Sequence, residues 1–221
     1  CDQRRRILTG LEPTPTDAPN DAMEAARLIM EAGGKPKRTI LVILWAGEEF
    51  GLLGSRSWVE RFPEKLEHIS NMVNKDGGSQ PPVALSVPAA MMEDFKPIVE
   101  VINTINPEFP VELKERNPRL RPTRAWGTDS GPFAVKGVPT ISFEEGDPKG
   151  YNFSYMEIWH TERDTYNKAM PEYNEQSAVA TAVLVYGLAS LDHKLDREGY
   201  YMEETEEPAA PEKKRKKKSK D

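Results

Sequence analysis

The chain has 221 residues, which is long enough for one domain with a substantial hydrophobic core. Its 36 acidic residues outnumber its 30 basic ones, and the formal net charge is −6. Residues 203–221 hold seven basic and six acidic side chains, so the rest of the chain carries a net charge of about −7. This charge argues against nucleic acid as the main partner of the folded body.

The single cysteine, Cys1, excludes an internal disulfide framework. No apolar run reaches the roughly 18 residues that a membrane helix needs, and no signal-peptide pattern is present. A chain that opens on Cys rather than Met suggests a fragment or a processed product. Simple truncation and a lipoprotein-type end with a lipidated Cys1 are the two alternatives.

The first half of the chain alternates between helical and strand patterns. Residues 1–20 are rich in Pro, Thr and Asp, and we expect them to be irregular. Residues 21–32 place apolar side chains at helical spacing, with Asp21 as a candidate N-cap. The apolar, β-branched run at residues 39–45 predicts a strand, and residues 55–61 predict a second helix.

The second half continues the pattern. Strands are expected at residues 69–73 and 138–143, and helices at residues 95–105 and 174–191, the last covering the sheet. Pro81 and Pro82 predict a loop or an edge strand over residues 80–88, and the Pro- and Arg-rich residues 107–124 predict a surface excursion. The order of elements predicts an α/β fold of three layers, α/β/α, with a mostly parallel mixed sheet. One domain would cover residues 21–202, followed by a disordered charged tail at 203–221.

Two adjacent carboxylates, Glu48 and Glu49, follow the predicted strand at residues 39–45 and precede a glycine-rich turn. Adjacent residues of an extended segment point in opposite directions, so one acid can bind a metal while the other faces a water. Two acids at the end of a buried strand are costly unless they are solvated, metal-bound or paired. A solvated pair is the alternative, but α/β sheets bind ligands in clefts beyond the carboxyl ends of strands.

Asp76, Asp129 and His160 extend this pattern along the chain. Asp76 follows a predicted strand and precedes two glycines, Asp129 lies in a polar turn, and His160 lies in a loop. Carboxylate oxygens and imidazole nitrogens are ligands that zinc takes. Each feature alone is weak, because Asp76 can be a turn former and His160 an ordinary loop histidine. Their order favours a hydrolytic site built from several strand ends.

Residues 35–171 resemble the zinc-dependent aminopeptidase and carboxypeptidase family of two-metal exopeptidases, which also contains glutamate carboxypeptidases and the non-catalytic transferrin receptor ectodomain. The matching pieces, in the family's order, are WAGEEFGLLGSRSWVE, NKDGG, GTDSGPFAVKGVPTISF and WHTERDT. The resemblance implies a zinc-exopeptidase-like fold without its first strands, a peptide substrate, two zinc ions and an exported protein.

Residue by residue, the resemblance implies that Glu48 is the general base, which takes a proton from the metal-bound water and returns it to the leaving amine. Glu49 and His160 resemble ligands of one zinc ion, and Asp76 resembles a ligand of the other. Asp129 resembles an acid beside the site that shapes the substrate pocket. The two ions would polarise the scissile carbonyl and stabilise the tetrahedral oxyanion.

The family has two further ligands upstream, a His in a His-x-Asp turn and an Asp that bridges both metals. This chain has no His before His68, so the first of these is absent. Asp17 precedes the predicted helix as the bridging Asp does, although Pro19 interrupts the stretch between them. Asp21 competes with it as a simple N-cap. The simplest explanation is that the chain covers the C-terminal part of a longer enzyme.

We therefore expect a metal-dependent exopeptidase, in the first instance an aminopeptidase. The first alternative is a catalytically inactive binding or scaffold domain of the same fold. The second is a polyanion binder through the basic run at residues 213–218. The competing interpretation of this run is a disordered tail that adds solubility. Trp126 and Trp159 flank the site turns and are candidates for lining a substrate pocket. Oligomeric state cannot be inferred from these patterns.

Overall fold

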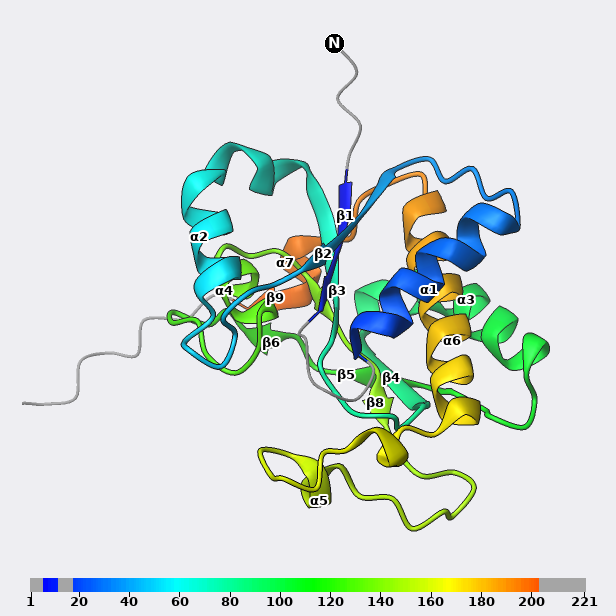
Figure 1. The fold of residues 1–221 in the computed structure, drawn as a ribbon. Helices are drawn as coiled ribbons and strands as arrows, with labels where there is room; N and C mark the ends of the chain where they lie inside the picture. The colour runs from blue at the N-terminus through cyan, green and yellow to red at the C-terminus, as the bar shows by residue number, and fades with distance from the viewer. Residues whose placement is uncertain (1–5, 12–17, 203–221) are drawn as a thin grey trace, which may run out of the picture.

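The computed structural model describes residues 6–11 and 18–202 (Figure 1). Four strands form a wholly parallel sheet in the order β2-β1-β3-β7. A second sheet has the order β5-β4-β8, and a pair of short strands, β6 and β9, forms the third. The strands are β1 (Arg6–Leu11), β2 (Thr39–Leu44), β3 (Ile69–Lys75), β4 (Pro82–Pro88), β5 (Glu112–Arg116), β6 (Arg119–Leu120), β7 (Thr140–Ile141), β8 (Glu144–Glu145) and β9 (Tyr201–Met202).

Helices cover both faces of the parallel sheet, with α1, α3 and α6 on one side and α2, α4 and α7 on the other (Figure 1). This arrangement confirms the three-layer α/β architecture. The α-helices are α1 (Ala18–Glu31), α2 (Leu53–Arg61), α3 (Met92–Ile105), α4 (Ser130–Val135), α5 (Tyr155–Ile158), α6 (Pro171–Ser190) and α7 (Arg197–Tyr200). Three 3-10 turns, η1 (Pro63–His68), η2 (Ala89–Met91) and η3 (Tyr166–Lys168), complete the described part of the chain. No helix in residues 18–202 has the length and apolar character needed to cross a bilayer.

Each face of the parallel sheet has its own hydrophobic core. The larger core packs β3 and β4 against α3 and α6, and its fully buried side chains include Leu85, Phe95 and Leu184. Parallel sheets are covered on both faces, and β3 accordingly is buried at every position. The burial of β3 matters for the site because this strand leads directly into Asp76.

The smaller core lies under α2 and α4 and is aromatic. Phe133 of α4 lies between two tryptophans, with ring centroids 5.8 Å from Trp45 and 5.5 Å from Trp58. Trp45 is a buried member of this core, and Trp58 is partly buried against it. Because Trp45 directly precedes the turn with Glu48, and Phe133 follows Asp129 in the same short segment, this core supports two site segments from below.

The structure corrects the expectation that residues 1–20 are irregular. Within them, Arg6–Leu11 forms β1, which pairs with β2 on one side and β3 on the other. Asp21 is not an N-cap either. Helix α1 begins earlier, at Ala18, and Asp21 lies inside it with its side chain buried.

The expectations for residues 80–88 and 107–124 were also wrong in part. β4 is the central strand of its sheet, parallel to β5 and antiparallel to β8. Pro82 is tolerated because it is the first residue of the strand, where a missing N–H costs least. β5 and β6 both lie in the segment that was expected to be a surface excursion, because pairing with β4 and β9 supplies the partners that local sequence does not show.

The aromatic core gives a testable expectation for stability. Phe133→Ala should lower the free energy of unfolding by about 3–5 kcal/mol, because it removes a fully buried ring from between two tryptophans. Phe50→Ala is the matched control: the ring of Phe50 is 82% exposed, so its loss should cost less than about 0.5 kcal/mol. Urea denaturation of both variants measures the difference, and equal losses would contradict the packing described here.

Candidate active site

Glu48 and Glu49 lie in a compact turn between β2 and α2. β2 ends at Leu44, and Gly47, Gly51 and Leu52 then adopt positive φ values of 70°, 98° and 63°. The carbonyl oxygen of Glu48 accepts hydrogen bonds from the amides of Gly51 and Leu52, at 2.9 and 2.8 Å. The two acids therefore project from a tight turn rather than from an extended strand end. Glu48 is half-buried and Glu49 is exposed.

Glycine is required at one position of this turn by close approach. The amide of Gly54 donates to the carbonyl of Ala46 at 2.9 Å, and a Cβ on Gly54 would lie 2.8 Å from that same oxygen. Real Cβ atoms essentially never come so near a backbone oxygen. This close approach explains the second glycine of the GLLGS run, Gly54, which packs the turn against the residues that follow β2.

His160 comes from a distant part of the sequence and meets Glu49. Its Nε2 lies 3.1 Å from Oε1 of Glu49, and the two side chains are 54% and 58% exposed. The residue has a φ of +55°, and its ring packs on that of Trp159 with centroids 4.7 Å apart. The segment with α5 lies beyond the carboxyl ends of the parallel strands (Figure 1). The structure therefore brings together the two residues that the family resemblance assigns to one metal.

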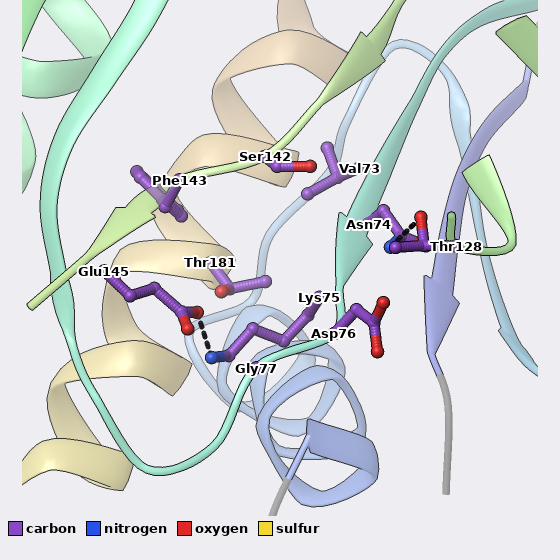
Figure 2. Close-up of a pocket in the computed structure, with 10 residues that line it drawn as sticks. All are labelled: Val73, Asn74, Lys75, Asp76, Gly77, Thr128, Ser142, Phe143, Glu145 and Thr181. Carbon is purple, nitrogen blue, oxygen red and sulfur yellow. Dashed lines mark hydrogen bonds and ion pairs between the residues drawn. The ribbon is translucent and has the colours of Figure 1, made fainter. Parts of the chain in front are cut away.

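Asp76 follows β3 and lines a separate cleft of about 220 Å³ (Figure 2). The cleft runs between the end of β3, the turn before α4 and the strand segment leading into β8. Its other lining residues include Asn74, Thr128, Ser142 and Glu145. Figure 2 shows Asp76 directed to the same side as Asn74 and Thr128, whose side chains are joined by a hydrogen bond from Nδ2 to Oγ1 of 3.1 Å.

Asp129 is fully buried beside this cleft and lies at the start of α4. Its Oδ1 accepts a hydrogen bond from Oγ of Ser55, in α2. Burial raises the pKa of Asp129 to about 6, the Ser55 hydrogen bond opposes this rise, and the charge of Asp76 adds to it. The charge of Asp76 therefore acts on Asp129. The hydrogen bond from Ser55 links the start of α4 to α2, so Asp129 fits the role of an acid that supports the site.

The described residues bring two candidate metal ligands into contact. Glu49 and His160 are donors of the type that zinc takes, at a separation compatible with a shared ion. Within residues 6–11 and 18–202, however, no three His, Cys, Asp or Glu side chains come together in a way that could hold a metal. Asp17, the remaining candidate ligand, lies outside the described residues.

Three residues near these acids were not singled out from the sequence. Ser55 and Asn74 orient Asp129 and Thr128 through the hydrogen bonds above, and Lys75 forms a buried ion pair with Glu145. Asn74 and Lys75 had a visible signal, since they directly precede Asp76 in the NKDGG turn. Ser55 had none beyond its place in the GLLGS run.

Three acids, Glu144, Glu145 and Asp147, lie in β8 and just after it, and all three are engaged within the chain. Glu144 pairs with Lys114, and Glu145 pairs with Lys75. Asp147 accepts hydrogen bonds from backbone amides of the following loop and from the Tyr173 hydroxyl. The loop therefore has internal partners for all three acids.

Comparison with known proteins gives a family match over most of the chain. Residues 22–185 match the model described as "Peptidase family M28". Carboxypeptidase Q of Xenopus laevis is 28% identical over 174 residues, which are 79% of this chain and 34% of that protein. The chain thus spans about a third of the length of this curated relative.

Solved structures with this fold include a peptidase M28 precursor from Shewanella amazonensis SB2B, with a TM-score of 0.65 and 22% identity over 89% of this chain and 44% of that one. BSAP, a zinc aminopeptidase from Bacillus subtilis, has a TM-score of 0.60 and 17% identity over 91% of this chain and 50% of that one. At these identities the likeness supports the fold alone.

The environment of Asp129 predicts an unusual pH dependence. Its pKa of about 6 exceeds the ordinary 3.8, so the folded state binds the proton more tightly than the unfolded chain does. The stability that the protonated carboxyl contributes is complete below about pH 4 and is lost as pH rises through about 6. Asp129→Asn has no proton to lose. Its free energy of unfolding, relative to wild type, should therefore rise by about 1–3 kcal/mol between about pH 4 and 7.

Asp147→Asn provides a control of opposite sign. The Tyr173 hydroxyl and three backbone amides lower the pKa of Asp147, so the ionised carboxylate contributes stability that is present above its ordinary pKa and is lost as pH falls. The Asn variant should accordingly lose stability relative to wild type as pH rises. Urea unfolding across this range measures both trends. A flat pH profile for the Asp129→Asn difference would contradict the buried environment.

Proposed function

Because the chain belongs to peptidase family M28, a family of metal-dependent exopeptidases, we propose that it provides catalytic residues of such an enzyme, with Glu48 as the general base. The observation that carries the proposal is the 3.1 Å contact between Glu49 and His160. These residues are far apart in sequence, and each is a candidate zinc ligand in its own motif. An ordinary solvated acid pair at Glu48 and Glu49 gives no reason for the second motif to meet the first.

In this proposal Glu49 and His160 hold one zinc ion, while Asp76 and Asp17 contribute to a second. Bound zinc supplies Lewis acidity, which polarises a scissile carbonyl and makes a water easier to deprotonate. The assignment of two positions rests on the family resemblance, in which Glu49 and His160 share one ion and Asp76 binds the other. Catalytic zinc normally has three protein ligands, so further ligands are required beyond those that the described residues bring together.

Glu48 is suited to proton transfer because it shares the turn with Glu49 and is less exposed than its neighbour. We assign it the removal of a proton from the attacking water and the return of that proton to the leaving amine. The hydrogen bonds from Gly51 and Leu52 to the backbone carbonyl of Glu48 fix the position of this residue in the turn. Asp129, buried under the same end of α2, supports the segment without contacting substrate.

The preferred substrate is a peptide with a free amino terminus. This aminopeptidase assignment, and export of the protein, rest on the family resemblance. The activity belongs to the whole protein, and the chain matches only part of its relatives. The competing function is a scaffold of the same fold with an incomplete metal site, and the two experiments below separate them.

The first experiment tests the base. Glu48→Gln should lower kcat by about 10²–10⁴-fold on an amino-terminal chromogenic substrate, because the amide cannot accept the proton. It should leave zinc affinity, measured by calorimetric titration, unchanged. Turnover equal to that of wild type would reject Glu48 as the base. An N-blocked substrate with a free carboxyl terminus, assayed in parallel, reports which end of the peptide is cleaved.

The second experiment tests the ligand pair. Glu49→Ala and His160→Ala should each weaken the same zinc-binding step in a titration of the chain. His68→Ala is the matched control, because His68 and Glu67 form another exposed pair with Nε2 and Oε1 3.1 Å apart, formed by adjacent residues in η1. The control should titrate as wild type does. Absence of zinc binding by the wild-type chain would favour the scaffold function.

A further inference from the structure

A buried lysine lies immediately before the candidate ligand Asp76. The side chain of Lys75 is 7% exposed, and its Nζ donates a hydrogen bond to Oε1 of Glu145. The same Nζ donates to the carbonyl of Gly78 at 3.2 Å and lies 3.9 Å from Oδ2 of Asp21. Asp21 and Glu145 are themselves 3% and 19% exposed. The result is an ion cluster of one cation and two anions inside the domain.

The cluster joins three elements that are separate in sequence. Asp21 lies in the first turn of α1, Lys75 is the last residue of β3, and Glu145 belongs to β8. The turn after β3 also lies close to Glu145. A Cβ on Gly77 would be 1.9 Å from Oε2 of Glu145, so a side chain at this position would require Glu145 to shift. The backbone that carries Asp76 is therefore held between the lysine hydrogen bond to Gly78 and the carboxylate of Glu145.

Stability alone does not explain this arrangement. A buried cation loses its hydration, and a buried ion pair can often be replaced by neutral or apolar side chains without loss of stability. What the charged cluster adds is direction, since Lys75 can satisfy its charge only by pointing toward Glu145 and Asp21. Adjacent residues at a strand end point to opposite sides. Figure 2 shows Lys75 directed to Glu145 and Asp76 directed away from it, toward Thr128.

We propose that Lys75 is a positioning residue for Asp76: its buried contacts with Glu145, Asp21 and the Gly78 carbonyl fix the end of β3, so that Asp76 faces the cleft beside Thr128. The assignment of Asp76 as a metal ligand rests on the proposed function. The fixing of the turn by Lys75 does not, and it can be measured in the metal-free chain. A shift of the β3 register by one residue would exchange the two sides and direct Asp76 into the interior.

The test neutralises the buried cluster and, separately, an exposed ion pair. Lys75→Met with Glu145→Gln and Asp21→Asn, called the buried-pair variant, removes all three charges of the cluster and retains its volume. Lys114→Met with Glu144→Gln does the same for the neighbouring exposed pair, whose Nζ and Oε2 are 3.0 Å apart and whose side chains are 41% and 47% exposed. Both variants and wild type are examined as the full chain by thermal unfolding, by backbone NMR relaxation and by titration with zinc alone.

In wild type, residues 76–79 should have rigid order parameters of about 0.85, and in the buried-pair variant they should fall below about 0.6 while the unfolding temperature stays within about 5 °C. Zinc binding that depends on Asp76 should weaken about tenfold. The exposed-pair variant should match wild type in every measurement. Rigid residues 76–79 in a folded buried-pair variant would overturn the proposal, as would mobile residues 76–79 in wild type.

Lys75→Arg covers the case in which the neutralised variant does not fold. The guanidinium keeps the charge and the donors, so the order parameters should remain near those of wild type. A Lys75→Arg variant that folds but has mobile residues 76–79 would also overturn the proposal. If wild type binds no zinc, the proposed function fails, and the order parameters alone decide the role of Lys75. If zinc binds and is unaffected while the turn stays rigid, the role of Lys75 fails and the proposed function stands.

Discussion

The parallel pairing of β2, β1 and β3 is the constraint on which the candidate site depends. Parallel strands place their carboxyl ends at one edge of a sheet, so the turn after β2 and the turn after β3 emerge on the same side. The loop with α5 returns to that edge and brings His160 to Glu49. Neither acid turn carries out the proposed chemistry by itself. The sheet brings the two turns to one edge, and the hydrophobic cores on its two faces support them.

Much of this arrangement could be predicted because the signals are local and strongly periodic. The apolar run before Glu48 and the helical spacing over α1 and α3 each report a single element. β1 could not be predicted, because its six residues follow a charged stretch and it becomes a strand only by pairing on both sides. β4 was underestimated for a related reason, since the prolines at its start were weighed without the partners on either edge of the strand.

The site shows the same division between local and distant information. Glu48, Glu49 and Asp76 lie in turns that follow strands indicated by the sequence, and His160 was paired with Glu49 through the family resemblance alone. The cluster around Lys75 depends on three distant segments, so no local pattern identifies it. An additional limit applies to Asp76 and Asp129, whose mutual repulsion is visible only once β3 and α4 are placed side by side.

The position of β1 has a consequence for how the domain is assembled. β2 and β3 do not pair with each other; each pairs with β1, which comes before both in the chain. Every pairing of β2 and β3 with β1 therefore closes a long loop, which costs chain entropy. β1 thus joins the two strands whose following turns carry the acids, and a change that weakens β1 would separate both turns at once.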